Sequence, residues 1–260
     1  MAMLIEKNDK RQYQNTPLDL VVCQLNFPTI LSVSASSPNI FQDKIREDYP
    51  LYQSQQISSF GVTFDLSTQQ VVPPQPQQSS TLHQFFTLDR NYILSLSNND
   101  IKLETTKYSN WEDYISRFEK IISIFEGIYR PAVYTRIGLR YINIIKKDKF
   151  NYGWKDMISP SFLGVLGDDD IPKEDMEISF YSTKIPFEYN GNTCQVDIKT
   201  GLGKENGMDL VFLIDCDYSF SQNVLRENKI DILTSLNVGS DYFFHRIITN
   251  KMSEYMGYQE

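Results

Sequence analysis

The segment SNWEDYISRFEKIISIFEG, residues 109–127, constrains the fold more than any other, because its apolar residues recur at the spacing of one helix face. Ser109 suits an N-cap, and acidic residues follow it in the first turn. Gly127 favours an end to the helix. We therefore predict an amphipathic helix over residues 110–127, which needs another surface to cover its apolar stripe. That stripe consists of Trp111, Tyr114, Ile115, Phe118, Ile121, Ile122 and Phe125.

A second amphipathic segment, residues 238–256, carries apolar residues around more than one stripe. A helix that is apolar over more than about 100° of arc must bury a second face. That face could pack within the chain, in a homodimer or against a partner protein, and the sequence leaves these alternatives open. As an intermolecular surface we predict Phe243, Ile247, Met252 and Tyr255. A shorter helix is expected over residues 38–48.

Other segments alternate polar and apolar residues, as β-strands do. In LDLVVCQLNF, residues 18–27, one face is wholly apolar. Turn-forming triplets separate strand candidates at 82–88, 92–97 and 101–106, so we predict an antiparallel meander there. We also expect a hairpin around Asn190-Gly191. Further strands are expected at 57–66, 135–145, 176–185, 193–200 and 209–216, and loops at the proline-rich segment 71–80 and at GLGKENG, 201–207.

Together these elements predict an α+β fold in which antiparallel meander sheets pack against long amphipathic helices. The loop-like segment 146–175 lies between two groups of such elements. We therefore expect an N-terminal α+β half over residues 1–150 and a C-terminal α+β half over residues 151–260. The two could be similar half-domains, packed into one compact unit.

The charge and composition of the chain limit the classes of partner that it could bind. The chain of 260 residues has 25 basic and 33 acidic side chains, a net charge of −8. Nucleic-acid binders usually carry a basic excess, so a nucleic acid is the less favoured partner. No apolar run is long enough to span a bilayer, and the charged N-terminus lacks the features of a signal peptide. With three scattered cysteines, the sequence predicts a cytoplasmic protein without membrane contact.

Several segments together carry a family resemblance. They are PLDLVVCQLNFP, the helix WEDYISRF, YRPAVYT, the strand RIGLRYINII at 136–145, VFLIDCDY at 211–218 and the closing FFHRIITNKMSEYMG. From about Pro17 to Gly257 the chain resembles a sporadically distributed bacterial family of uncharacterised proteins of this length. The resemblance brings no catalytic residues. By analogy, its patchy distribution implies a place in toxin–antitoxin or anti-phage defence loci.

Catalytic chemistry has little support in the sequence. The chain has two histidines, His83 and His245, and no cysteine or histidine spacing typical of a metal site. The acidic run at 168–170 lacks the spacing of a calcium loop. GLGKENG lacks the residue order of a phosphate-binding loop. We therefore expect no metal, no cofactor and no catalytic residue.

One strand could bind a ligand on its polar face. In residues 135–145, Arg136, Gly138 and Arg140 alternate with apolar residues and share one face of a sheet. Two guanidinium groups beside a glycine gap could bind a small anion or a nucleotide. They could also form cross-strand ion pairs, with Gly138 marking a bulge or a packing contact. Nearby, the aromatic residues Tyr108, Trp111 and Tyr141 could stack a base or form the rim of the core.

These observations favour a non-enzymatic interaction protein, an accessory or regulatory member of a defence locus, that binds a protein partner or forms a homo-oligomer. The alternative is a small-anion or nucleotide-binding domain that uses Arg136 and Arg140. A hydrolase or nuclease is the third and least supported hypothesis, because no acid–base group converges in the sequence.

Overall fold

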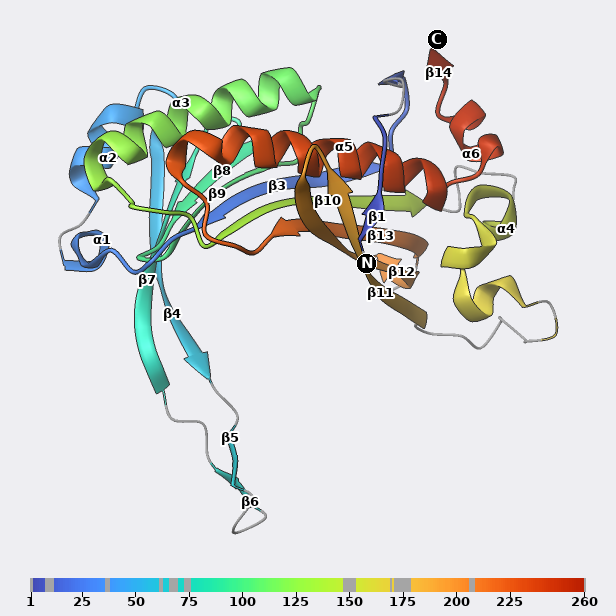
Figure 1. Cartoon of the computed structure of the whole chain (residues 1–260), viewed down its shortest axis with the longest axis horizontal. Helices are drawn as coiled ribbons and strands as arrows, with labels where there is room; N and C mark the ends of the chain where they lie inside the picture. Colours follow the sequence, from blue (N-terminus) through green and yellow to red (C-terminus); the bar gives the residue numbers. More distant parts are fainter. Residues whose placement is uncertain are drawn as a thin grey trace.

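Ten strands of the described chain form one sheet (Figure 1). The computed structural model describes residues 2–7, 12–35, 38–60, 63–65, 70–72, 76–146, 153–168, 170, 179–205 and 209–259. Neighbouring strands are antiparallel, except that β1 pairs in parallel with β11. The strand order is β1 (Met3–Leu4), β11 (Ser179–Tyr189), β12 (Asn192–Glu205), β13 (Asp209–Phe220), β10 (Arg136–Lys146), β3 (Leu18–Asn26), β9 (Asp100–Thr105), β8 (Tyr92–Leu96), β7 (Pro76–Phe86) and β4 (Leu51–Phe60).

The predicted fold class, antiparallel meander sheets packed against long amphipathic helices, is therefore wrong. The chain builds a single large mixed sheet. The reason lies in β10, which pairs with β3 on one side and with β13 on the other, so that strands from both parts of the chain join. This pairing satisfies backbone groups that the edges of two separate sheets would leave open. The division of the chain near residue 150 stays a prediction.

Strand alternation divides the sheet into two faces. In β3, Val21, Cys23 and Leu25 are buried, whereas the residues between them are partly exposed. Leu139 of β10 lies opposite Cys23 and is buried on the same face. Arg140, the next residue, therefore points to the other face. One face of the sheet thus carries the core, and the other carries charged side chains.

Two helices of 19 residues lie over the core face (Figure 1). The first of them begins where Asn110 accepts a hydrogen bond from the Asp113 backbone N–H at 2.8 Å. The Tyr114 hydroxyl anchors it to the sheet by donating to the Leu103 carbonyl at 2.6 Å. Neither helix has the uninterrupted apolar length that crossing a bilayer requires, and no other described helix has it. The α-helices are α1 (Leu31–Ala35), α2 (Asn39–Ile45), α3 (Trp111–Tyr129), α4 (Trp154–Met157), α5 (Lys229–Ile247) and α6 (Asn250–Tyr255).

The predicted helix over 238–256 is two helices with different bounds. Helix α5 begins nine residues earlier, at Lys229, and ends at Ile247. Ile248 is extended and forms an isolated bridge with Ile158, next to α4. The Thr249 side chain then accepts a hydrogen bond from the Met252 backbone N–H at 3.2 Å and caps α6. The long-range bridge therefore interrupts a pattern that the local sequence would continue.

Two predicted loops contain strand residues. β7 begins at Pro76, opposite Phe60 of β4, inside the segment 71–80 that we expected to be a loop. A proline is tolerated there because it is the first residue of the strand. The β4–β7 hairpin extends away from the helices, with the small pair β5 (Thr63–Asp65) and β6 (Gln70–Val72) beyond it (Figure 1). Gly201–Glu205 of GLGKENG belong to β12, and the rest of that segment lies outside the described residues.

The hairpin predicted around Asn190-Gly191 is confirmed. Tyr189 of β11 pairs with Asn192 of β12, and the two residues between them have φ angles of 50° and 78°. Two successive positive φ angles define the tight turn that matches the twist of the strands it joins. A last short pair, β2 (Gln12–Tyr13) and β14 (Tyr258–Gln259), joins a segment near the start of the sequence to one near its end.

Helix α3 does not end at Gly127 but at Tyr129, and Arg130 caps it with a φ of 49°. The left-handed region is strained for a residue with a Cβ. We expect Arg130→Gly to raise the free energy of unfolding by about 0.5–1 kcal/mol, measured by urea denaturation. Arg130→Ala removes the charge but keeps the Cβ, so it should bring no such gain. An equal gain in both variants would assign the effect to the charge instead.

Candidate functional site

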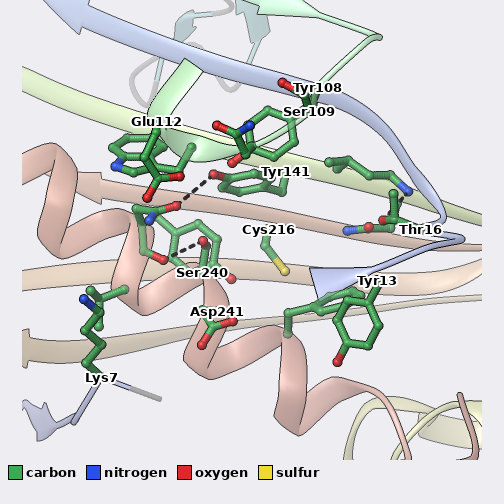
Figure 2. A pocket seen from close by; sticks show the side chains of 18 residues that line it. Lys7, Tyr13, Thr16, Tyr108, Ser109, Glu112, Tyr141, Cys216, Ser240 and Asp241 are labelled. Atoms are coloured by element: carbon green, nitrogen blue, oxygen red, sulfur yellow. Dashed lines mark hydrogen bonds between the residues drawn. The ribbon is translucent and has the colours of Figure 1, made fainter. Parts of the chain in front are cut away.

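A cavity of about 410 Å³ lies between the N-terminus of α3, the middle of α5 and strands β10 and β13 (Figure 2). We call it the aromatic pocket, because rings form much of its lining. The N-terminal segment closes one side with Lys7, Tyr13 and Thr16. The rings are those of Tyr13, Tyr108, Trp111, Tyr141, Tyr218 and Phe244.

Three tyrosines from different elements form a continuous wall of this pocket. The ring of Tyr141 on β10 meets the ring of Tyr108 edge to face, with centroids 5.9 Å apart. On its other side it meets Tyr218 of β13 at 6.5 Å, again edge to face. Edge-to-face contacts hold rings in defined orientations. Tyr108, Trp111 and Tyr141, which the sequence singled out as possible stacking residues, thus line one cavity.

Helix α5 supplies polar groups with fixed directions. The Tyr141 hydroxyl donates to Asn237 Oδ1 at 3.1 Å. The Ser240 hydroxyl donates to the Asn237 backbone carbonyl at 2.7 Å, as Figure 2 shows. A ring hydroxyl from the sheet is thereby tied to the helix, and the wall of the pocket is preorganised.

Burial keeps the titratable groups of the wall protonated. It raises the pKa of Tyr108 to about 12. Burial also raises the pKa values of Tyr141 and Tyr218 well above the usual value for a phenol. It raises the pKa of the Cys216 thiol to about 12, so this cysteine is not a thiolate nucleophile near neutral pH. The wall therefore offers hydroxyl groups for hydrogen bonding and no reactive anion.

The formally charged groups that line the described pocket are Lys7, Glu112 and Asp241. Asp241 Oδ1 lies 3.4 Å from Nδ1 of His245, one turn further along α5. On the other side of that ring, Nε2 lies 2.8 Å from the Tyr13 hydroxyl. Among the described lining residues there is no arginine, so the pocket has no guanidinium group to bind an anion.

The predicted anion-binding arginines lie elsewhere, on the open face of the sheet. Arg136 Nη2 donates to Asp217 at 2.8 and 2.9 Å, and Arg140 donates to Asp215 at 2.6 and 2.7 Å. Both line a second pocket of about 290 Å³ together with Gly138 and Asp217. An anion there would compete with carboxylates that already occupy both guanidinium groups. Anion binding by Arg136 and Arg140 stays a prediction.

Gly138 makes room for one of these arginines. A Cβ at this position would lie 2.3 Å from Nη1 of Arg136. The guanidinium group of Arg136 therefore lies across the glycine, on its way to Asp217. The gap that could have admitted a ligand is filled by a side chain of the same strand.

The predicted interaction residues are divided between the core and the surface. Phe243, Ile247 and Met252 are at most 1% exposed, whereas Tyr255 is 40% exposed. The second apolar face of the C-terminal segment is thus covered within the chain, because α5 packs against β10 and β13 whereas α6 packs against α4. Docking of a partner protein stays a prediction, without these three side chains as its surface.

Sequence reasoning missed Asn143, Tyr218, Asn237 and Ser240 as lining residues. Asn143 could have been noticed in the sequence, since it is the polar residue in the apolar run INII of β10. The other three lie 75 to 97 residues away from it, and only the packing of α5 against β10 and β13 brings them together. No family model matches this sequence, and no curated protein matches it either.

Proposed function

We propose that this protein binds a small organic molecule in the aromatic pocket. One observation carries the proposal: a cavity of about 410 Å³ is lined by six rings, with a few polar groups held in place between them. Small-molecule sites are typically cavities of roughly 300–1,000 Å³ with apolar and aromatic walls and a small number of placed polar groups. The position between helices and sheet matches this description.

The charges of the pocket favour a neutral or cationic ligand. Glu112 and Asp241 contribute two negative charges and Lys7 contributes one positive charge. Aromatic faces attract cations and repel anions. A ligand with a flat, apolar body can lie against the rings and keep any positive charge near the carboxylates of Glu112 and Asp241.

A binding role fits the chemistry of the pocket better than a catalytic one. Burial raises the pKa values of the Tyr108, Tyr141 and Tyr218 phenols and of the Cys216 thiol, so these groups stay neutral. A phenol or thiol that acts as a nucleophile or general base near neutral pH would need a pKa lowered toward 7, and burial moves these pKa values the other way. The fixed hydroxyl and amide groups are suited to orienting a ligand instead.

The proposal can be tested with a variant in which a larger side chain fills the cavity. Ser240 lines the pocket from α5, and its exchange for phenylalanine places a ring in the space that a ligand would use. We expect Ser240→Phe to weaken the binding of N-phenyl-1-naphthylamine, a neutral dye that fluoresces in apolar sites, about tenfold or more. Fluorescence titration of the full chain measures the dissociation constant.

Thr234→Phe is the matched control, because Thr234 lies exposed on the same helix and outside the pocket lining. It should bind the dye as the unchanged protein does. Failure of the unchanged protein to bind the dye at one site, or equal weakening in both variants, would contradict the proposal.

A further inference from the structure

A buried amide lines the aromatic pocket. Asn143 of β10 is only 5% exposed, which is unusual for asparagine. It lies in the same strand as Tyr141, two residues further along, and both residues line the cavity. Because side chains alternate along a strand, the amide and the ring share one face of the sheet.

Within the described chain, the Asn143 amide forms no hydrogen bond to another residue, although it has donors and an acceptor to satisfy. The Asn143 amide atoms are not among the fully enclosed side-chain atoms that lack a hydrogen bond in the described chain. The amide of Asn143 is therefore not sealed inside the core. Its small exposed fraction opens into the pocket that it lines.

The strand opposite Asn143 on one side, β3, carries a β-bulge. The pairing of β10 with β3 shifts register between Ile142 and Asn143, so that Asn143 lies opposite Leu18 and Asp19 is passed over. The extra residue belongs to β3, so β10 keeps its alternation and Asn143 stays on the same face as Tyr141. Bulges are frequent beside binding sites. A leucine would satisfy this apolar environment without an unpaired polar group.

We infer that Asn143 recognises a ligand edge on which a hydrogen-bond donor and an acceptor lie next to each other. Such an edge belongs to aryl carboxamides, lactams and amino-substituted nitrogen heterocycles. A side-chain amide pairs with it through two parallel hydrogen bonds, as asparagine does with adenine. The inference rests on the proposed function and names the chemical class of its ligand: a planar ring bearing an amide-like edge.

The Tyr141 and Tyr218 rings complete the recognition. They hold the flat body of the ligand while Asn143 pairs with its edge. A ligand without the edge would leave the amide unpaired in a site from which it has displaced water, and would bind more weakly for that reason.

The first arm of the test compares two small aromatic probes, benzamide and acetophenone. They have nearly the same shape, but acetophenone carries a methyl group where benzamide has its donor. Each displaces N-phenyl-1-naphthylamine from the full chain, and the ratio of their inhibition constants is compared between the unchanged protein and Asn143→Leu. We expect this ratio to shift against benzamide about tenfold in the variant, since the solvation of the probes cancels in the comparison.

The second arm measures thermal stability without ligand. If the amide serves a ligand, Asn143→Leu should raise the melting temperature by about 2–4 °C, because it removes a polar group that the fold leaves unpaired. A fall of several degrees would show that the amide supports the fold, and would overturn the inference. Asn143→Ala, which cannot overpack the site, should show the same change in probe ratio.

The outcomes separate the two proposals. If the dye binds and the probe ratio is unchanged in Asn143→Leu and Asn143→Ala, the recognition by Asn143 is refuted and the proposed function stands. If the dye does not bind to the unchanged protein, both proposals are refuted. A changed ratio with an intact or raised melting temperature supports both.

Discussion

Raising the pH from 9 to 12 is expected to unfold the protein cooperatively. Burial raises the pKa of the Cys194 and Cys216 thiols from 9.0 to about 12, and that of the Tyr108 phenol from 10.0 to about 12. All three are acids whose neutral form is favoured in the folded state. Between pH 9 and 12 the unfolded chain therefore loses protons that the folded chain retains, and the free energy of unfolding falls as the pH rises.

The size of the effect follows from the pKa shifts. One pKa unit corresponds to about 1.4 kcal/mol, so these groups together lower the stability by several kcal/mol. The free energy of unfolding of a domain is only about 5–15 kcal/mol in total. Urea denaturation at a series of pH values measures the slope, and phenolate absorbance reports when the tyrosines ionise.

Cys194→Ala is the control for the alkaline prediction. It removes one of the titrating thiols, so the decline in stability between pH 9 and 12 should become shallower, whatever the stability at neutral pH. Complete ionisation of all 16 tyrosines near pH 10 with the fold intact would contradict this expectation, because it would place the buried phenols in contact with water.

Gly239→Ala is expected to destabilise the protein by about 1–3 kcal/mol, because overpacking displaces well-packed neighbours. A Cβ at this position of α5 would lie 2.6 Å from Cζ and 2.7 Å from Cε2 of Phe187. The Phe187 ring is fully buried and packs against Phe243 and Tyr218, with centroids at 5.6 and 6.4 Å. It has little room to move away.

Gly127→Ala in α3 provides the matched comparison. A Cβ there would meet nothing within 4 Å, and the position is exposed in a helix of the same length. Alanine at this position should therefore stabilise the protein by about 0.5–1 kcal/mol through helix propensity alone. Urea denaturation of both variants shows whether each substitution raises or lowers the free energy of unfolding. Stabilisation by both would mean that the contact between α5 and β11 is looser than described.

Close packing at Gly239 also positions the pocket. The neighbouring residues Asn237, Val238 and Ser240 line the cavity, so the glycine lets this stretch of α5 approach the sheet. Any substitution that lifts the helix at this point should therefore alter the shape of the aromatic pocket as well as the stability of the fold.

Local patterns in the sequence predicted local structure well. The apolar stripe of residues 111–125 became α3, and Asn190-Gly191 became a tight hairpin turn. The alternation in RIGLRYINII separated Arg140 from the buried Leu139 as expected. Each of these features depends on spacing within a few residues, where side-chain geometry and backbone preference act directly.

The sheet and the pocket could not be predicted, because both depend on contacts between distant residues. β3 pairs with β10 across more than 100 residues of chain, and the alternation of each strand is compatible with many partners. The bridge between Ile158 and Ile248 ends a helix whose sequence pattern continues. Asn143 could be noticed as a polar residue, but only the positions of Tyr218 and α5 show that it lines a cavity.

The most direct test of the central claim is native mass spectrometry of the full chain after incubation with a protein-free metabolite extract. We expect one small-molecule adduct on the unchanged protein and on Thr234→Phe, and its loss in Ser240→Phe, whose added ring occupies the aromatic pocket. An unchanged protein that carries no adduct, or an adduct that Ser240→Phe retains, would contradict it.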